Sequence, residues 1–139
     1  DRIQNRKKIM LGSVVLSFVL MNLILHMPML STGIRLGLMM LYGISNSGVA
    51  LAYAVAGEMH SRRISGIAIA FTNMASIAVG ALLQPIMGWM LQTGWSSRVV
   101  NGLTVYPEQA YHDVMLILPL SLFVAFLFLL CVKDTYKAE

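Results

Sequence analysis

Long stretches without a charged side chain dominate the pattern of polar and apolar positions along this chain. Asp, Glu, Lys and Arg are absent from Ile9–Ile34, Leu36–Gly57, Ile64–Ser97 and Val114–Val132. About 20 mainly apolar residues in a helix are enough to cross the hydrocarbon core of a bilayer. The pattern therefore predicts four membrane-spanning helices, at residues 8–27, 34–57, 65–92 and 114–132.

Helices account for these stretches better than membrane-spanning strands do. Such strands alternate apolar and polar residues over about 10 residues, whereas Leu122–Val132 is apolar throughout. Inside lipid, every backbone N–H and C=O needs a hydrogen-bond partner, and a helix supplies these partners within one segment. We therefore expect an all-α integral membrane protein whose helices run up and down, with residues 1–139 forming a partial membrane domain.

The longest connection, residues 93–113, is expected to contain a β-hairpin. Within Val99–Val105, Asn101-Gly102 is flanked by apolar and β-branched residues, and this dipeptide favours the type I′ turn of two-residue hairpins. Pro107 is expected to be the first residue of the last helix, where its missing N–H is tolerated. Glu108 would then lie in the first turn, where the helix dipole stabilises an acidic side chain.

The distribution of basic residues predicts the orientation of the helices. Of the ten Lys and Arg residues, only Arg35 and Arg98 lie on one side of the predicted spans, and the other eight lie on the opposite side. Short loops rich in Lys and Arg stay in the cytoplasm. Both termini and residues 57–64 are therefore expected in the cytoplasm, with the connections 28–33 and 93–113 on the other side of the membrane.

Composition and the placement of charge favour lipid over nucleic acid as a partner. The net charge is +4, but hydrophobic residues make up 58% of the chain and charged residues only 12%. Because the basic residues are placed at the ends of the spans, we expect the lipid bilayer, and no nucleic acid, as a partner. The single cysteine, Cys131, has no second cysteine in this chain with which to form a disulfide.

The chain carries no recognisable enzyme motif. It contains no His-Glu-x-x-His, no Gly-x-Ser-x-Gly and no P-loop, which are the sequences that typically hold a zinc ion, a nucleophilic serine or a nucleotide phosphate. His26, His60 and His112 are widely scattered, and no carboxylate falls at the centre of a span. We expect no enzymatic activity, no cofactor and no metal.

The second span has a polar face. Tyr42, Asn46 and Tyr53 follow a helical spacing that places them on one side of the segment. Polar groups at this depth usually face a bundle interior or a water-filled cavity. Two interpretations remain open for this face: it lines a cavity for a solute, or it forms hydrogen bonds that hold two helices together.

The third span carries the most continuous polar stripe. Asn73, Ser76, Gly80 and Gln84 recur at intervals of three and four residues, and Pro85 follows. A proline inside a helix removes one backbone hydrogen bond and can bend the axis. The stripe therefore suits either a moving interface between two helical bundles or a tightly packed static one.

Charged residues gather at the expected cytoplasmic end. Asp1, Arg2 and Arg6 precede the first span, and Glu58, Arg62 and Arg63 lie between the second and third spans. Opposite charges at this end could pair as a latch that closes and opens with the helices. The alternative is that the basic residues serve only to fix the orientation of the chain.

These charged segments resemble a signature of the major facilitator superfamily of transporters. In that family Asp-Arg-x-Gly-Arg-Arg lies in the cytoplasmic loop before helix 9, and Asp1, Arg2 and Arg6 match it. Gln4 replaces the usual glycine and Asn5 the first of the paired arginines.

Later segments extend the resemblance over the whole chain. Glu58 and Gly66 match a glutamate at the inner end of helix 10 and a glycine that opens helix 11. Ser65–Trp89 resembles helix 11 of bacterial members that carry organic anions and small metabolites. The chain is thus similar to the last third of such a transporter, helices 9–12 of a twelve-helix fold.

The resemblance implies a role for each span. The second would line the solute cavity, the third would border the opposite bundle, and the first and last would support them from the lipid side. The missing partners would be the remaining N-terminal helices and a small-molecule solute. Residues expected to bind the solute are Tyr42, Asn46, Tyr53, Asn73, Ser76 and Gln84, with Gln84 nearer the outer gate.

The expected function is therefore that of a fragment of a secondary active transporter, a symporter or antiporter. It would work by alternating access as a multi-pass protein of the bacterial inner membrane. Two alternatives remain: a standalone four-helix exporter that works as a dimer, and a membrane anchor or assembly subunit that transports nothing. The chain begins with Asp1 rather than Met, which favours a segment of a longer protein.

Overall fold

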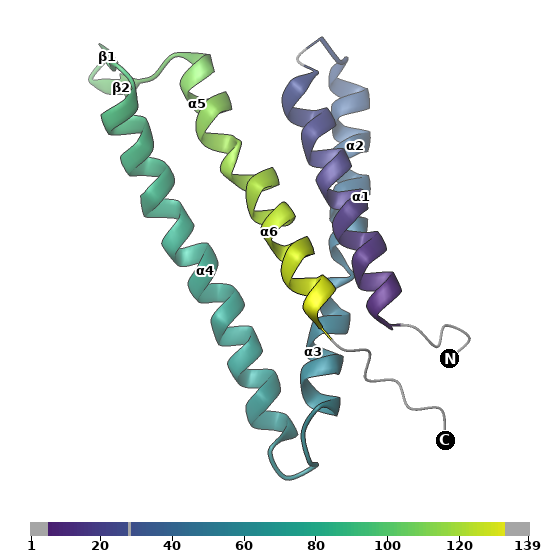
Figure 1. Ribbon diagram of the computed structural model, residues 1–139. Coiled ribbons are helices and arrows are strands. Elements are labelled where there is room, and N and C mark those ends of the chain that lie inside the picture. The colour runs from purple at the N-terminus through teal and green to yellow at the C-terminus, as the bar shows by residue number, and fades with distance from the viewer. Residues whose placement is uncertain (1–5, 28, 133–139) are drawn as a thin grey trace.

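The computed structural model describes residues 6–27 and 29–132. Its elements are α1 (Arg6–His26), α2 (Thr32–Asn46), α3 (Val49–Glu58), α4 (Ser65–Gly94), β1 (Arg98–Val100), β2 (Leu103–Val105), α5 (Glu108–Met115) and α6 (Ile117–Cys131). Apart from one short hairpin, these elements are helices, and successive spans run in opposite directions (Figure 1).

Four segments are long and apolar enough to cross a membrane. They are Arg6–His26, Thr32–Glu58, Ser65–Gly94 and Glu108–Cys131, with 21, 27, 30 and 24 residues. The mean hydropathy of their best windows lies between 1.4 and 2.9. The prediction of an all-α chain with four such segments is confirmed. The last candidate span is longer than the predicted 114–132, because it includes the helical turns that begin at Glu108.

The second span is not one regular helix, as the sequence predicted, but two helices joined at Ser47 and Gly48. Across this break the amides of Ser47 and Gly48 donate to Ile44 O and Ser45 O, at 3.0 and 3.3 Å. These i→i+3 bonds are the tighter pattern of a 3₁₀ turn. The side chain of Ser45 bonds to another helix, which adds a tertiary constraint at the same point.

The last span is also divided, at Leu116 between α5 and α6. Pro119 has no N–H, so the carbonyl of Met115 loses the donor that a regular helix would provide. The chain tightens there instead, with Leu116 N donating to Asp113 O at 3.3 Å. Pro85, in contrast, lies inside α4 without interrupting the helix assignment.

The packing places α1 at the centre of one group and α4 at the edge of the molecule. Helix α1 contacts both α2 and α6, while α4 contacts α3 and α5 (Figure 1). Of the residues of α1, only Ser17 and Leu20 are buried, and the expectation that the first span supports the others from the lipid side stays a prediction. No residue of α4 is buried, so this helix lies against only part of the described chain.

The β-hairpin follows the prediction. Strands β1 and β2 pair antiparallel with Val100 opposite Leu103. Asn101 and Gly102 both have positive φ, 52° and 77°, as a type I′ turn requires. Pro107 precedes the first helical residue instead of being it, and Glu108 lies in the first turn as expected.

Two ends of the molecule are named from these features. The hairpin end holds the hairpin, the α1–α2 connection and the start of α5. The basic end holds the start of α1, the end of α6 and the α3–α4 connection (Figure 1).

Candidate functional site

Three polar side chains meet between α3 and α4. The hydroxyl of Tyr53 donates to Asn73 Oδ1 at 3.3 Å and lies 3.3 Å from Ser76 Oγ. Ser76 Oγ in turn donates to the carbonyl of Asn73 at 2.8 Å. The structure therefore brings together three of the six residues predicted to bind a solute. We call Tyr53, Asn73 and Ser76 the α3–α4 polar cluster.

The α3–α4 polar cluster is open on one side. Asn73 and Ser76 are exposed and Tyr53 is only partly buried. The bonds within the cluster use Asn73 Oδ1 and its backbone carbonyl. The side-chain amide N–H groups of Asn73 donate to no other group among the described residues, so they are available to an acceptor on a bound molecule.

Asn46 and Tyr42 do not join this cluster. The amide of Asn46 donates to Tyr42 O of its own helix, at 3.1 Å. Asn46 also lines a cavity of about 270 Å³ between α1, α2, α3 and α6, whereas Tyr53 bonds to α4. The helical spacing that suggested one shared face is interrupted by the break at Ser47 and Gly48.

Gln84, the remaining predicted residue, lies further along α4 and is exposed. It continues the stripe that begins at Asn73, and no hydrogen bond joins it to the α3–α4 polar cluster within the described chain. Its predicted place near the outer gate stays a prediction.

A second polar cluster, which the sequence analysis did not single out, joins α1 to α2. Ser17 Oγ donates to Ser45 Oγ at 2.9 Å, and Ser45 Oγ donates to Ser13 O at 2.8 Å. Ser17 and Ser45 are 1% and 6% exposed. Since these hydroxyls satisfy one another, the cluster acts as a structural link between helices. The four-residue spacing of Ser13 and Ser17 was the available signal, because it places both on one helical face.

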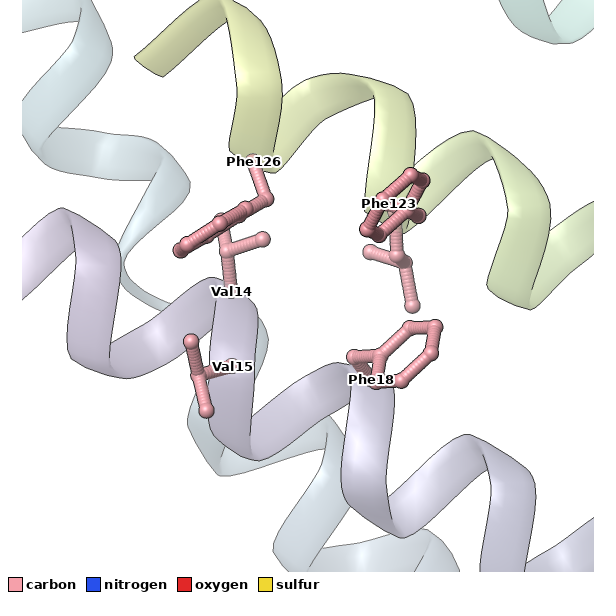
Figure 2. Close-up of a pocket in the computed structure, with 6 residues that line it drawn as sticks. Val14, Val15, Phe18, Phe123 and Phe126 are labelled. Carbon is pink, nitrogen blue, oxygen red and sulfur yellow. The ribbon is translucent and has the colours of Figure 1, made fainter. Parts of the chain in front are cut away.

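An apolar cavity of about 200 Å³ lies between α1 and α6. Figure 2 shows Val14 and Phe18 of α1 facing Phe126 and Phe123 of α6, with Val15 beside Val14 on α1. The rings of Phe18 and Phe123 are 6.4 Å apart and inclined by 47°. The cavity presents no polar side chain, so we assign it to packing between apolar helices and not to recognition of a polar solute.

At the basic end, the first turn of α1 is tied to two other helices. Arg6 forms an ion pair with Glu58 at the end of α3. Lys7 Nζ donates to Leu130 O in the last turn of α6 at 2.8 Å, where a cation complements the negative end of the helix dipole. These contacts connect α1, α3 and α6 at the same end.

The structure therefore pairs two members of the predicted latch. Arg62 and Arg63 are exposed in the α3–α4 connection. Asp1 and Arg2 lie outside the described residues. The pairing of Arg6 with Glu58 is observed, while the role of these six residues as a gate stays a prediction.

The described residues contain no group of three His, Cys, Asp or Glu side chains placed to hold a metal ion. No family model, no curated protein and no solved structure matches the chain. The resemblance to the major facilitator superfamily thus rests on the motifs of the sequence.

Proposed function

We propose that this chain is the C-terminal part of a secondary active transporter of the major facilitator superfamily, its four spans corresponding to helices 9–12. It would help to move a small solute across the bacterial inner membrane, without enzymatic chemistry, by alternating access. The observation that carries this proposal is the open α3–α4 polar cluster, formed within two candidate membrane spans, in the half of each that lies nearer the basic end.

The exposure of α4 supports a larger assembly. This helix has 30 residues, none of them buried, and its stripe includes exposed Asn73, Ser76 and Gln84. Polar groups at membrane depth seldom face lipid, because hydrocarbon offers them no hydrogen bonds. A water-filled cavity covered by the missing N-terminal helices would satisfy them.

The contacts at the basic end support a gating role. In the proposed orientation this end faces the cytoplasm, and the links from Arg6 to Glu58 and from Lys7 to Leu130 would hold three helix ends together. Breaking them would let α3 separate from α1, which is the kind of movement that opens a cavity to one side of the membrane.

Water access to the α3–α4 polar cluster tests the proposal without knowledge of the solute. The experiment uses the full-length protein with Cys131→Ser, and adds either Ser76→Cys or Ala75→Cys. These neighbours have the same depth but lie about 100° apart around the helix. A membrane-impermeant, water-soluble thiol reagent should modify Ser76→Cys at least about tenfold faster than Ala75→Cys, because thiols react as solvated thiolates.

A functional arm accompanies the labelling. Asn73→Leu removes the polar amide at similar size and should weaken solute uptake, while Thr72→Val should not. Thr72 is the matched control because its hydroxyl bonds to Ala68 O of its own helix. Equal, slow labelling of both cysteines would show that the α3–α4 polar cluster only holds two helices together. It would contradict the proposed water-filled cavity. Normal uptake by Asn73→Leu would remove Asn73 from the site.

A further inference from the structure

An apolar groove lies between α3 and α4 at the basic end. Its volume is about 400 Å³, within the range of about 300–1,000 Å³ that is typical of small-ligand sites. It begins beside the α3–α4 connection, at one end of the molecule (Figure 1), and continues along the first two turns of α4. Its lining residues include His60 and Ile64 nearest the connection, and Ile67, Phe71 and Thr72 further along α4. We call it the basic-end groove.

The walls of the basic-end groove offer a bound molecule mainly hydrocarbon. Ile67 and Phe71 are 70% and 63% exposed. The two polar side chains of the lining, His60 and Thr72, contact the backbone carbonyl four residues earlier, through Nδ1 at 3.0 Å and Oγ1 at 2.9 Å. The groove therefore suits a hydrocarbon chain better than a polar solute.

The basic-end groove lies on the side of α4 opposite the polar stripe. Phe71 of the groove and Asn73 of the α3–α4 polar cluster are two positions apart, which places them about 160° apart around a helix. Ile64 and Phe71 are seven residues apart and share one helical face. Because polar groups in a span turn away from lipid, the face that carries the groove is the one that meets lipid.

Two arginines lie at the mouth of the groove, beside the α3–α4 connection. Arg62 and Arg63 are the residues of the chain that come shortly after His60 and directly before Ile64, both of which line the groove. Consecutive Cα atoms are only about 3.8 Å apart, and the connection is a tight turn in which Ile64 N donates to Ser61 O at 3.0 Å. The covalent path therefore holds both arginines close to the mouth.

The mouth carries a net positive charge within the described chain. Glu58, its nearest acidic residue in sequence, forms an ion pair with Arg6. Arg62 and Arg63 are exposed, so their guanidinium groups are accessible to an anion at the surface of the membrane.

We propose that the basic-end groove binds an anionic phospholipid, with its phosphate at Arg62 and Arg63 and an acyl chain in the groove. A guanidinium binds phosphate through paired hydrogen bonds, and basic pockets between spans attract anionic head groups. The connection joins two candidate spans, and the groove runs from it along α4 into the second of them. A phospholipid has the same order, since its head group lies at the membrane surface and its chains extend toward the centre.

This combination selects one kind of occupant. A free phosphate would use the arginines and leave the apolar walls exposed, while an uncharged lipid would use the walls and leave the arginines. The inference concerns the lipid-facing side of α4 and does not rest on transport.

Photocrosslinking in the full-length protein tests the proposal. The protein is placed in phosphatidylcholine nanodiscs that contain a small fraction of either phosphatidylglycerol or phosphatidylcholine with a diazirine on one acyl chain. After irradiation, peptide mass spectrometry locates the labelled residues. The anionic probe should label residues 64–72 at least about fivefold more than the zwitterionic probe, since each basic residue near a membrane surface favours anionic lipid by roughly that factor.

Substitutions of single charges separate a local site from general attraction. Arg63→Gln should lower labelling of residues 64–72 by the anionic probe several-fold. Lys8→Gln is the matched control, because Lys8 is also exposed at the basic end but lies on α1, and it should leave this labelling unchanged. Arg62→Lys with Arg63→Lys keeps both charges and should keep the preference for the anionic probe.

A second pair of variants tests the groove without changing charge. Ala68 lines the groove, so Ala68→Leu should occupy part of it and lower labelling by the anionic probe. Ala75→Leu is the control, because Ala75 lies on the same face of α4 two turns further along and outside the groove lining. It should have no effect.

The comparison of the two probes needs no variant, so the proposal can fail even if a variant does not fold. Equal labelling of residues 64–72 by both probes would identify a general lipid contact and overturn it. Absence of label from this segment with either probe would show that protein covers the groove, with the same consequence. An equal loss of labelling in Lys8→Gln and Arg63→Gln would also refute the site.

Discussion

At the scale of single residues, Gly48 and Ser13 determine how closely α1 approaches the break between α2 and α3. A Cβ added at Gly48 would lie 2.3 Å from Ser13 Oγ and 2.5 Å from Ser13 Cβ. Real side-chain carbons do not approach so closely, so the helices would have to separate. Separation would also strain the bond from Ser45 Oγ to Ser13 O.

Gly48→Ala is therefore expected to destabilise the protein by about 1–3 kcal/mol, the usual cost of overpacking a close contact. Thermal unfolding in detergent, followed by circular dichroism, measures the effect. Ser13→Gly removes the clashing side chain and should restore much of the lost stability in the double variant. Gly43→Ala is the control, since a Cβ there meets nothing within 4 Å, and it should be neutral or slightly stabilising. Equal destabilisation by both alanines would contradict the steric explanation.

At the scale of helices, the basic end is held by contacts between charged side chains and helix termini. Arg6 and Glu58 are 21% and 45% exposed, and ion pairs this accessible contribute about 0–1 kcal/mol. Their importance would therefore lie in the relative position of α1 and α3 and not in overall stability.

Glu58→Gln should lower the free energy of unfolding by less than about 1 kcal/mol. It should nevertheless change the access of water-soluble reagents to the α3–α4 polar cluster. In the Ser76→Cys background, a thiol reagent applied from the basic end should react several-fold faster when the pair is broken. The charge exchange Arg6→Glu with Glu58→Arg restores a pair and should return the rate toward its original value. An unchanged rate in Glu58→Gln would exclude this pair from the latch.

At the scale of the whole molecule, the described residues bury little apolar surface. The buried hydrophobic side chains are Leu20, Val55, Ala110, Val114 and Leu129, whereas many large apolar side chains on every span are exposed. In water such a surface would drive association, since burial stabilises by about 25 cal/mol per Å². Contact with lipid or with further helices would remove this apolar surface from water.

The distribution of basic residues predicts that the basic end faces the cytoplasm. In a Cys131→Ser background, Ser97→Cys at the hairpin end should react with an impermeant thiol reagent applied to intact cells. Ser61→Cys at the basic end should react only after the membrane is opened. Both positions are exposed in the structure, so burial does not confound the comparison. The reverse labelling pattern would refute the orientation.

What the sequence determined by itself follows from local physics. The four spans were predictable because a bilayer requires about 20 apolar residues per helix whatever their neighbours are. The hairpin was predictable because Asn101 and Gly102 tolerate the positive φ angles that the turn requires. Neither inference needed to know which helix packs against which.

The tertiary structure decided everything that depends on contacts between distant residues. The break at Gly48 coincides with the close approach of Ser13. Asn46, before the break, lines a cavity between α1, α2, α3 and α6, whereas Tyr53, after it, bonds to Asn73 of α4. The pairing of Asn73 and Ser76 with Tyr53, and of Arg6 with Glu58, joins residues 20 or more positions apart. Helical periodicity gives the face of one helix, but only packing determines which neighbour that face meets.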